Sequence, residues 1–213
     1  MDDAGRSYKA AHYDHGNGVS IADVDGDGYQ DIYFSNQVGS NQLWRNRGDG
    51  TFHDITQKAG VAVREPIGVS ASFADIDNDG DPDLYVTTVR AGNRMFENDG
   101  SGRFMDITKT SGLGHRGHSS SAVFFDYDRD GMLDLFLANV GEYTRDKIRP
   151  VVNDVTTEHL ESGEFKFHDA YEDAFGGHLK PERTEPSLLF RNLGQGRFED
   201  VTAKMNLFDT SWS

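Results

Sequence analysis

An acidic pattern of nine residues, Asp-x-Asp-x-Asp-Gly-x-x-Asp, occurs three times in this chain of 213 residues. The copies begin at Asp23, Asp75 and Asp126, so successive copies are 52 and 51 residues apart. A fixed period of this length means that one structural unit is built repeatedly and buries its apolar faces against its neighbours. The period therefore restricts the fold to a repeat architecture.

A second block of sequence recurs together with the acidic pattern. It reads NQLWRNRGDGTFHDIT at 41–56, NRMFENDGSGRFMDIT at 93–108 and SLLFRNLGQGRFEDVT at 187–202. The first two copies are 52 residues apart, whereas the third follows the second by 94 residues. The third unit therefore contains an insertion of about 42 residues, which we place at 142–186.

Each unit is predicted to form four short strands. A run of small and apolar residues precedes each acidic pattern, and a run rich in β-branched and aromatic residues follows it (DIYFSN, DLYVTT and DLFLAN). The Gly-x-Gly pairs at 48/50, 100/102 and 194/196 supply the positive φ that a hairpin turn requires. Four antiparallel strands per unit of about 50 residues are typical of a β-propeller blade, and a solenoid of hairpins is the alternative.

These units predict an all-β chain of about three four-stranded antiparallel blades. We place the blades at 18–68, 69–119 and 120–213, and the last one contains the insertion. Short helical turns are expected only near 57–59 and 202–205.

The acidic pattern predicts a calcium site in each blade. Side chains at positions 1, 3 and 5 converge when the loop curls, Gly at position 6 permits the turn, and a carbonyl at position 7 and a carboxylate at position 9 complete six or seven oxygen ligands. Magnesium is disfavoured because it rarely accepts a cage made only of protein atoms. The predicted ligands are Asp23, Asp25, Asp27, Tyr29 and Asp31; Asp75, Asp77, Asp79, Asp81 and Asp83; and Asp126, Asp128, Asp130, Met132 and Asp134.

An EF-hand is rejected for these loops. That motif needs a Glu at position 12, where this chain has Phe34, Val86 and Leu137, and the predicted flanks are strands rather than helices.

The net charge of −15 is concentrated in the same loops. They contain 13 of the 36 acidic residues, and without them the net charge would be −2. Nucleic acid is not an expected partner because no basic stripe is visible. The absence of Cys excludes disulfides, zinc–thiolate sites and cysteine nucleophiles, and no apolar run is long enough to span a membrane as a helix.

The acidic pattern, its flanks and the N-x-G-x-G-x-F-x-D-[IV]-T block resemble FG-GAP/VCBS repeats, as in integrin α-subunit propellers. The closest resemblance is to bacterial and cartilage-acidic-protein-like proteins that carry such repeats before an ASPIC/UnbV domain. It covers about 16–141 and 187–205. The resemblance implies a propeller with one calcium per blade, in the loop between the first two strands, and a role in cell adhesion, ligand binding or scaffolding. The chain departs from the family's pattern in two ways. It has three motifs, whereas the family's propellers usually have about seven blades, and it has no ASPIC/UnbV segment at its C-terminal end.

The ends of the chain suggest a part of something larger. Aligning the third unit with the second places Ser213 on Ser119, just before a fourth innermost strand would begin. The first residues, MDDAGRSYKA, lack the features of a secretory signal peptide. We therefore expect a piece of a longer protein, or a ring that a partner or self-association completes, because an open arc leaves strand edges unpaired.

A candidate ligand face lies opposite the calcium loops. The insertion is expected there, together with two histidine pairs in register, His12/His15 and His115/His118. These imidazoles could bind an anionic ligand or a transition metal, or they could simply hydrogen-bond the loops. The insertion could be a functional loop or an ordinary surface excursion.

The leading functional hypothesis is an extracellular, periplasmic or cell-surface module that calcium stabilises and that binds a protein or carbohydrate ligand or acts as a scaffold. Calcium is abundant enough outside the cytosol to fill loops of modest affinity. The alternatives are a propeller-based enzyme (a lyase, oxidoreductase or hydrolase acting on a polymer or glycan) and a purely structural set of blades. No catalytic residue is assigned.

Overall fold

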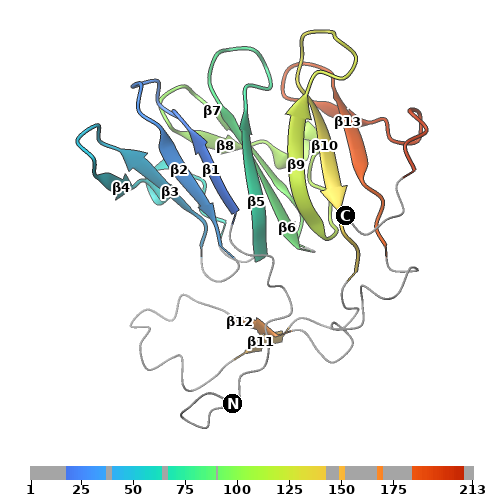
Figure 1. Ribbon diagram of the computed structural model, residues 1–213, viewed down its shortest axis with the longest axis horizontal. Coiled ribbons are helices and arrows are strands. Elements are labelled where there is room, and N and C mark those ends of the chain that lie inside the picture. Colours follow the sequence, from blue (N-terminus) through green and yellow to red (C-terminus); the bar gives the residue numbers. More distant parts are fainter. Residues whose placement is uncertain are drawn as a thin grey trace.

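The computed structural model describes residues 18–36, 40–63, 67–89, 91–142, 149–151, 167–169 and 184–208. Within these residues, three four-stranded antiparallel sheets stand side by side (Figure 1). In each sheet the strands keep their chain order. The described helical structure is limited to two short turns, α1 (Thr56–Ala59), as predicted, and α2 (Thr108–Ser111), which the sequence did not predict.

The three sheets are referred to as the first, second and third blades. The first contains β1 (Gly18–Ala22), β2 (Asp31–Ser35), β3 (Gln42–Asn46) and β4 (Phe52–Asp54). The second contains β5 (Ile67–Ala74), β6 (Asp83–Val89), β7 (Arg94–Asn98) and β8 (Phe104–Asp106). The third contains β9 (Ser119–Phe125), β10 (Asp134–Asn139), β13 (Leu188–Asn192) and β14 (Phe198–Asp200). Between β10 and β13, β11 (Arg149–Val151) pairs with β12 (Phe167–Asp169).

Packing between blades explains the burial patterns of the strands. In β2, alternate residues Asp31, Tyr33 and Ser35 are buried, as expected for a strand covered on one side. All seven residues of β6 are buried because the second blade is covered on both faces. The place of a blade in the row thus decides how many residues of its strands are buried.

The Asp-[IV]-Thr end of each repeat has a structural role. Thr56 donates its backbone N–H and its hydroxyl to Asp54 Oδ1, and its Oγ1 accepts a hydrogen bond of 2.8 Å from Leu43 N. Thr202 makes the corresponding bonds to Asp200 and Leu189. These bonds end the outermost strand, start the following turn and tie both to the neighbouring strand.

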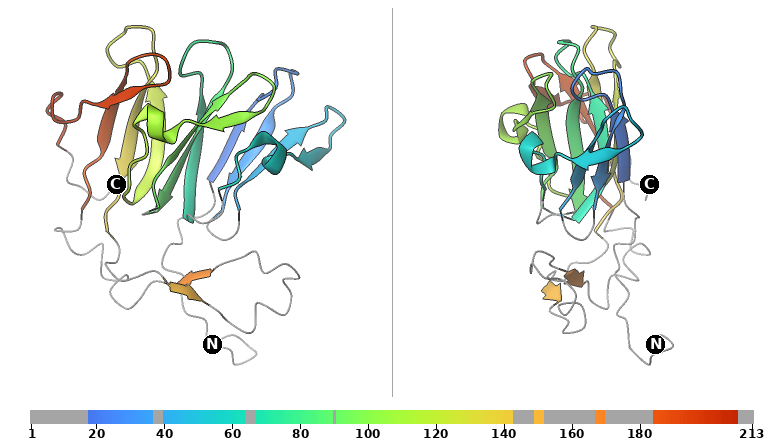
Figure 2. Two further views of the ribbon diagram at one scale, coloured as in Figure 1. Left: turned by 180° about the vertical axis from the view of Figure 1, so that it is seen from behind. Right: turned by 90° about the vertical axis from the view of Figure 1, so that its left-hand side faces the viewer.

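The cores lie between the blades. Tyr33 of the first blade packs edge-to-face on Phe73 of the second, with ring centroids 6.4 Å apart. Tyr85 packs in the same way on Phe124 of the third blade, at 6.2 Å. Edge-to-face pairs of this kind stabilise an interface beyond their buried area. With the innermost strands β1, β5 and β9 running side by side (Figures 1 and 2), this packing confirms the predicted all-β propeller-blade fold.

The two ends of the blades differ. The acidic loops that join β1 to β2, β5 to β6 and β9 to β10 lie together at one end (Figure 1). The strands β11 and β12, from the insertion, lie beyond the other end.

Candidate functional site

The three acidic loops share one backbone conformation. In the first loop, Asp23 accepts hydrogen bonds from Asp27 N at 3.1 Å and Gly28 N at 2.7 Å. The same pair of bonds forms on Asp75 and on Asp126. Gly28 has a φ of 88°, in the left-handed region that favours glycine. The first carboxylate of each motif therefore closes the turn.

Three carboxylates converge in every loop. In each set, one oxygen from each residue lies within 4.8 Å of the others. Like charges at this separation repel one another, and a divalent cation among them would reverse the sign of the interaction. The sets are Asp23, Asp25 and Asp27; Asp75, Asp77 and Asp83; and Asp126, Asp128 and Asp134.

These sets contain positions 1 and 3 of every motif, but the third member varies. It is position 5 in the first loop and position 9 in the other two. In all three loops the carboxylate of position 5 accepts a hydrogen bond from the backbone N–H of position 7, at 2.9 Å for Asp27 and 3.0 Å for Asp79 and Asp130. The structure thus brings together nine of the predicted carboxylates.

Position 9 is a buried anchor for the loop. Asp31, Asp83 and Asp134 are at most 2% exposed. Asp83 accepts Ile76 N at 3.0 Å through one oxygen and Asn98 N at 2.8 Å through the other. Burial raises the pKa of Asp83 to about 7, against the lowering effect of these hydrogen bonds. Sequence reasoning treated this position only as a ligand, whereas the structure shows that it also ties the loop to the third strand.

Position 7 turns its side chain away from the carboxylates. The Tyr29 ring lies over Gly48 and the Asp81 carboxylate lies over Gly100, both in the β-hairpin of the same blade. A Cβ at either glycine would collide with these side chains. Only the backbone carbonyl of position 7 remains to face an ion.

Arginine side chains compensate two of the loops. Arg45 contacts Asp25 and pairs with Asp27 at 2.9 Å. Arg191 pairs with Asp128 at 2.8 Å and Asp130 at 3.1 Å. The second blade has a glutamate at the same strand position, Glu97. Sequence reasoning missed this difference, although LWRN, MFEN and LFRN display it.

The donor atoms fit a hard cation. Every side-chain ligand in the three sets is a carboxylate oxygen, which is the chemistry that calcium prefers. In addition, Asp25 Oδ1 is buried and accepts no hydrogen bond from the described residues. A buried oxygen left without a donor is costly, and a cation would satisfy it.

A recurring asparagine connects each loop to the next blade. Asn98 Nδ2 of the second blade donates to Val24 O in the first acidic loop at 2.9 Å. Asn192 Nδ2 of the third blade donates to Ile76 O in the second loop at 2.8 Å. The sequence marks this asparagine by its fixed place in the second recurring block. Its hydrogen-bond partner belongs to another repeat, so the sequence pattern does not reveal that partner.

The histidines of the third blade lie at the opposite end. His118 directly precedes β9 and is 2% exposed. Its backbone N–H donates to Glu185 Oε2 at 2.7 Å, and its ring Nδ1 lies 2.7 Å from Glu185 Oε1. His115 Nε2 lies 3.4 Å from Asn139 Nδ2. The predicted His12 and His15 lie outside the described residues.

Glu185, at the end of the insertion, was not predicted. Burial alone would raise the pKa of Glu185, but the hydrogen bonds and charges of the histidines outweigh burial and lower it. Burial lowers the pKa of His115, against the opposing charges of Glu185 and Asp200. His118 and Glu185 therefore form a structural pair that holds the end of the insertion against β9.

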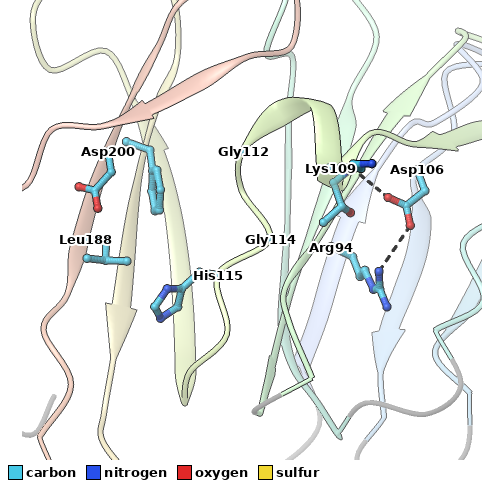
Figure 3. Close-up of a pocket in the computed structure, with 10 residues that line it drawn as sticks. Arg94, Asp106, Lys109, Gly112, Gly114, His115, Leu188 and Asp200 are labelled. Atoms are coloured by element: carbon cyan, nitrogen blue, oxygen red, sulfur yellow. Dashed lines mark hydrogen bonds and ion pairs between the residues drawn. The ribbon is translucent and has the colours of Figure 1, made fainter.

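A groove of about 780 Å³ lies between the second and third blades (Figure 3). On one wall, Arg94 pairs with Asp106 at 3.8 Å, and His115, Leu188 and Asp200 lie across the gap. A groove of this volume is within the range that accommodates small ligands. The residues lining it are Arg94, Asp106, Thr108, Lys109, Gly112, Gly114, His115, Leu188, Phe190 and Asp200.

Stacked four-stranded sheets, each with an acidic loop between its first two strands, define a repeat protein built from β-propeller blades. The profile of the FG-GAP-like repeat matches residues 23–86 and 75–137, which together make up more than half of the chain. The chain belongs to the FG-GAP-like repeat family, as its motifs suggested.

Curated relatives include cartilage acidic protein 1 from Xenopus tropicalis and from Homo sapiens. Each is 30% identical over 131 residues, covering 60% of this chain and 20% of the relative. The chain thus matches about a fifth of the length of these relatives. A structure from a study of specific recognition of non-reducing terminal N-acetylglucosamine by an Agrocybe aegerita lectin covers 93% of this chain and 40% of its own, with 18% identity and a TM-score of 0.45.

Across the described residues, no helix is long and apolar enough to cross a membrane.

Proposed function

We propose that this chain is a calcium-binding β-propeller module that works outside the cytoplasm and binds a protein or carbohydrate ligand or serves as a scaffold. The observation that carries the proposal is the convergence of three carboxylates within 4.8 Å in each acidic loop. Calcium would be held by the side chains at positions 1, 3, 5 and 9 and by the carbonyls of Tyr29, Asp81 and Met132. The ion would supply charge neutralisation and stiffen each loop.

The proposed location follows from the chemistry of the loops. The carboxylates at positions 1, 3 and 5 lie near the surface at one end of the blades, and such loops fill at the calcium concentrations found outside cells. The name of the relatives, cartilage acidic protein 1, associates those proteins with cartilage and supports the same location.

The groove between the second and third blades is the site that we propose for a ligand. It combines cationic, anionic and imidazole groups with the apolar walls of Leu188 and Phe190. Of the predicted histidines, His115 lines this groove, whereas His118 is buried against Glu185. The proposal therefore assigns ligand contact to His115 and a structural role to His118.

An enzyme remains the second candidate. The specific observation in its favour is that His115 and Asp200 lie on one wall of the groove (Figure 3). Substitution of His115 by Ala distinguishes an enzyme from a recognition module. It would abolish turnover of a glycan or polymer by an enzyme, but it would only weaken binding by a recognition module.

Calcium titration by isothermal calorimetry, compared with magnesium, tests the proposed metal function. We expect heat from calcium binding at about three sites and little heat from magnesium. A triple variant, Asp25→Asn, Asp77→Asn and Asp128→Asn, removes one charge from every loop and should weaken all of the sites. Absence of calcium heat in the wild-type chain would disprove the proposal.

A further inference from the structure

The first blade exposes a face that the other two blades bury. Val19 and Ile21 in β1 are 55% and 58% exposed, and Phe52 in β4 is 38% exposed. Apolar patches of this kind mark interaction surfaces. We call this surface the leading face, and its six apolar positions are Val19, Ile21, Ile32, Phe34, Trp44 and Phe52.

The same six positions form the interfaces between blades inside the chain. In the second blade they pack against the first as Ala71, Phe73, Leu84, Val86, Phe96 and Phe104. In the third blade they pack against the second as Ala122, Phe124, Leu135, Leu137, Phe190 and Phe198. The leading face of the first blade is therefore one half of an interface that the chain builds twice.

The polar part of that interface is also present. Asn98 and Asn192 each donate to a carbonyl in the acidic loop of the preceding blade. Asn46 is their counterpart in the first blade, and among the described residues its Nδ2 bonds only Gln30 O of its own blade, at 3.2 Å. Asn46 can therefore make the bond to a preceding blade as soon as such a blade is supplied.

The third blade exposes the other half of the interface between blades. Val123, Phe125 and Leu207 are 54%, 40% and 37% exposed, and the Phe125 and Tyr127 rings lie 6.4 Å apart. We call this surface the trailing face. Corresponding residues in the second blade contact the third: Ser72 donates to Ala122 O at 2.6 Å, and Ala74 packs against the core between the second and third blades.

We propose that the leading face of one copy of this chain binds the trailing face of a second copy, head to tail. In this contact Asn46 would donate to Tyr127 O of the second copy, which stands where Val24 and Ile76 stand in the inner interfaces. A head-to-tail contact uses two different surfaces, so it can continue from copy to copy until a ring closes.

One residue limits the fit. A Cβ on Gly60 would lie 2.9 Å from Phe104 O of the next blade, and a Cβ on Gly112 would lie 3.1 Å from Phe198 O. The third blade has Asn206 at this position, with a φ of 55°. The Asn206 side chain of the second copy would crowd the carbonyl of Phe52 in the first, so Asn206→Gly should strengthen the association.

Sedimentation velocity over a range of concentrations tests this contact in the chain of 213 residues. The wild type should associate reversibly, and Asn206→Gly should associate several-fold more tightly. Ile21→Lys on the leading face and Val123→Lys on the trailing face should each be monomeric alone. Their equimolar mixture should form heterodimers and nothing larger, because each dimer then joins the two intact faces and leaves the two blocked ones outside.

A matched control is Met105→Lys. Met105 is 62% exposed in β8 of the second blade, outside both faces, so its substitution should leave association unchanged. Circular dichroism should show native strand content in every variant. A wild type that stays monomeric at all concentrations would overturn the proposal. So would association of Val123→Lys alone at the wild-type level, because it would indicate contact between two leading faces or an unrelated partner surface.

Discussion

Single residues set the charge balance of each acidic loop. Arg45 and Arg191 place positive charge beside the first and third loops, whereas the second blade has Glu97 at the same strand position. Repulsion between carboxylates at short range is strong when no cation compensates it. We therefore expect the second loop to depend most on calcium, and we expect the other two loops to release an arginine when calcium binds.

Substitution of Arg45 by Gln should have opposite effects with and without calcium. Without calcium it should lower the free energy of unfolding by about 0.2–1 kcal/mol, the range for ion pairs exposed to solvent. With calcium present, the first loop should bind the ion more tightly because no arginine competes for Asp25 and Asp27. Calorimetry and urea unfolding measure the two effects. Arg116→Gln is the matched control, since Arg116 precedes β9 at the end of the blade away from the loops.

In the second loop, Asp79→Ala should weaken calcium binding more than Asp81→Ala does. Asp79 is at position 5, whose carboxylate faces the loop and accepts Asp81 N at 3.0 Å. Asp81 directs its carboxylate over Gly100 and keeps its carbonyl after substitution by alanine. We expect a loss of about tenfold or more in affinity for the first variant and little for the second. Equal losses in a calcium titration would mean that the positions have been assigned wrongly.

Within a blade, the acidic loop, the β-hairpin and the Asp-[IV]-Thr turn form one connected element. Asp83 joins the loop to β7 through Asn98 N, and Asn98 joins β7 to the preceding blade through Val24 O. A change in the loop can therefore reach the interface between blades through two successive hydrogen bonds. Calcium binding is expected to stiffen this path.

The asparagine in this path offers a matched comparison within one chain. Asn98→Ala removes a buried bond to another blade and should lower the free energy of unfolding by about 1–3 kcal/mol. Asn46→Ala removes a side chain at the same motif position whose Nδ2, among the described residues, bonds only Gln30 O of its own blade, so its cost should be smaller. Chemical denaturation at a fixed calcium concentration checks the difference. Equal costs would show that the bond between blades contributes nothing.

The buried carboxylate of Asp83 should make the calcium-free protein sensitive to pH. Its pKa in the folded state is about 7, above the ordinary aspartate value of 3.8. Because the folded pKa is raised, its contribution to stability is full below the ordinary value and is lost as the pH rises through about 7. Unfolding measured in a chelator from about pH 5 to about pH 7 should show a less negative slope for Asp83→Asn than for the wild type. Identical slopes would show that a group other than Asp83 causes the pH dependence.

On the scale of the whole molecule, stability comes from the interfaces between blades. The two core clusters each combine residues from adjacent blades, so no blade has a complete core of its own. Repeat proteins of this kind gain stability from nearest-neighbour contacts. The outer faces of the first and third blades are the places where this arrangement ends within the described residues.

Removal of calcium should lower the unfolding temperature of the whole chain. Each loop gathers three carboxylates within 4.8 Å, and without the ion their repulsion opposes folding. Differential scanning calorimetry with and without a chelator measures the shift, and added magnesium should not restore the lost stability. A melting temperature that chelation leaves unchanged would refute a structural role for calcium.

The amino-acid sequence by itself determined the repeat, the four strands of each blade and the position of every acidic loop. It could do so because these features depend on local patterns: alternation in strands, glycine at positive φ and carboxylates at fixed spacing. The family match and the three four-stranded sheets confirmed this part. The blade limits at 18–68, 69–119 and 120–213 and the complete ligand sets stay predictions.

Only the tertiary structure decided which groups compensate and connect the loops. Glu185 meets His118 across 67 residues, and Asn192 reaches Ile76 across 116 residues. Nothing in the local pattern marks such pairs, because they form only when one blade packs on another. Exposure of the leading face has the same origin. The packing of each blade against its neighbour determines whether an apolar side chain is buried or left in water.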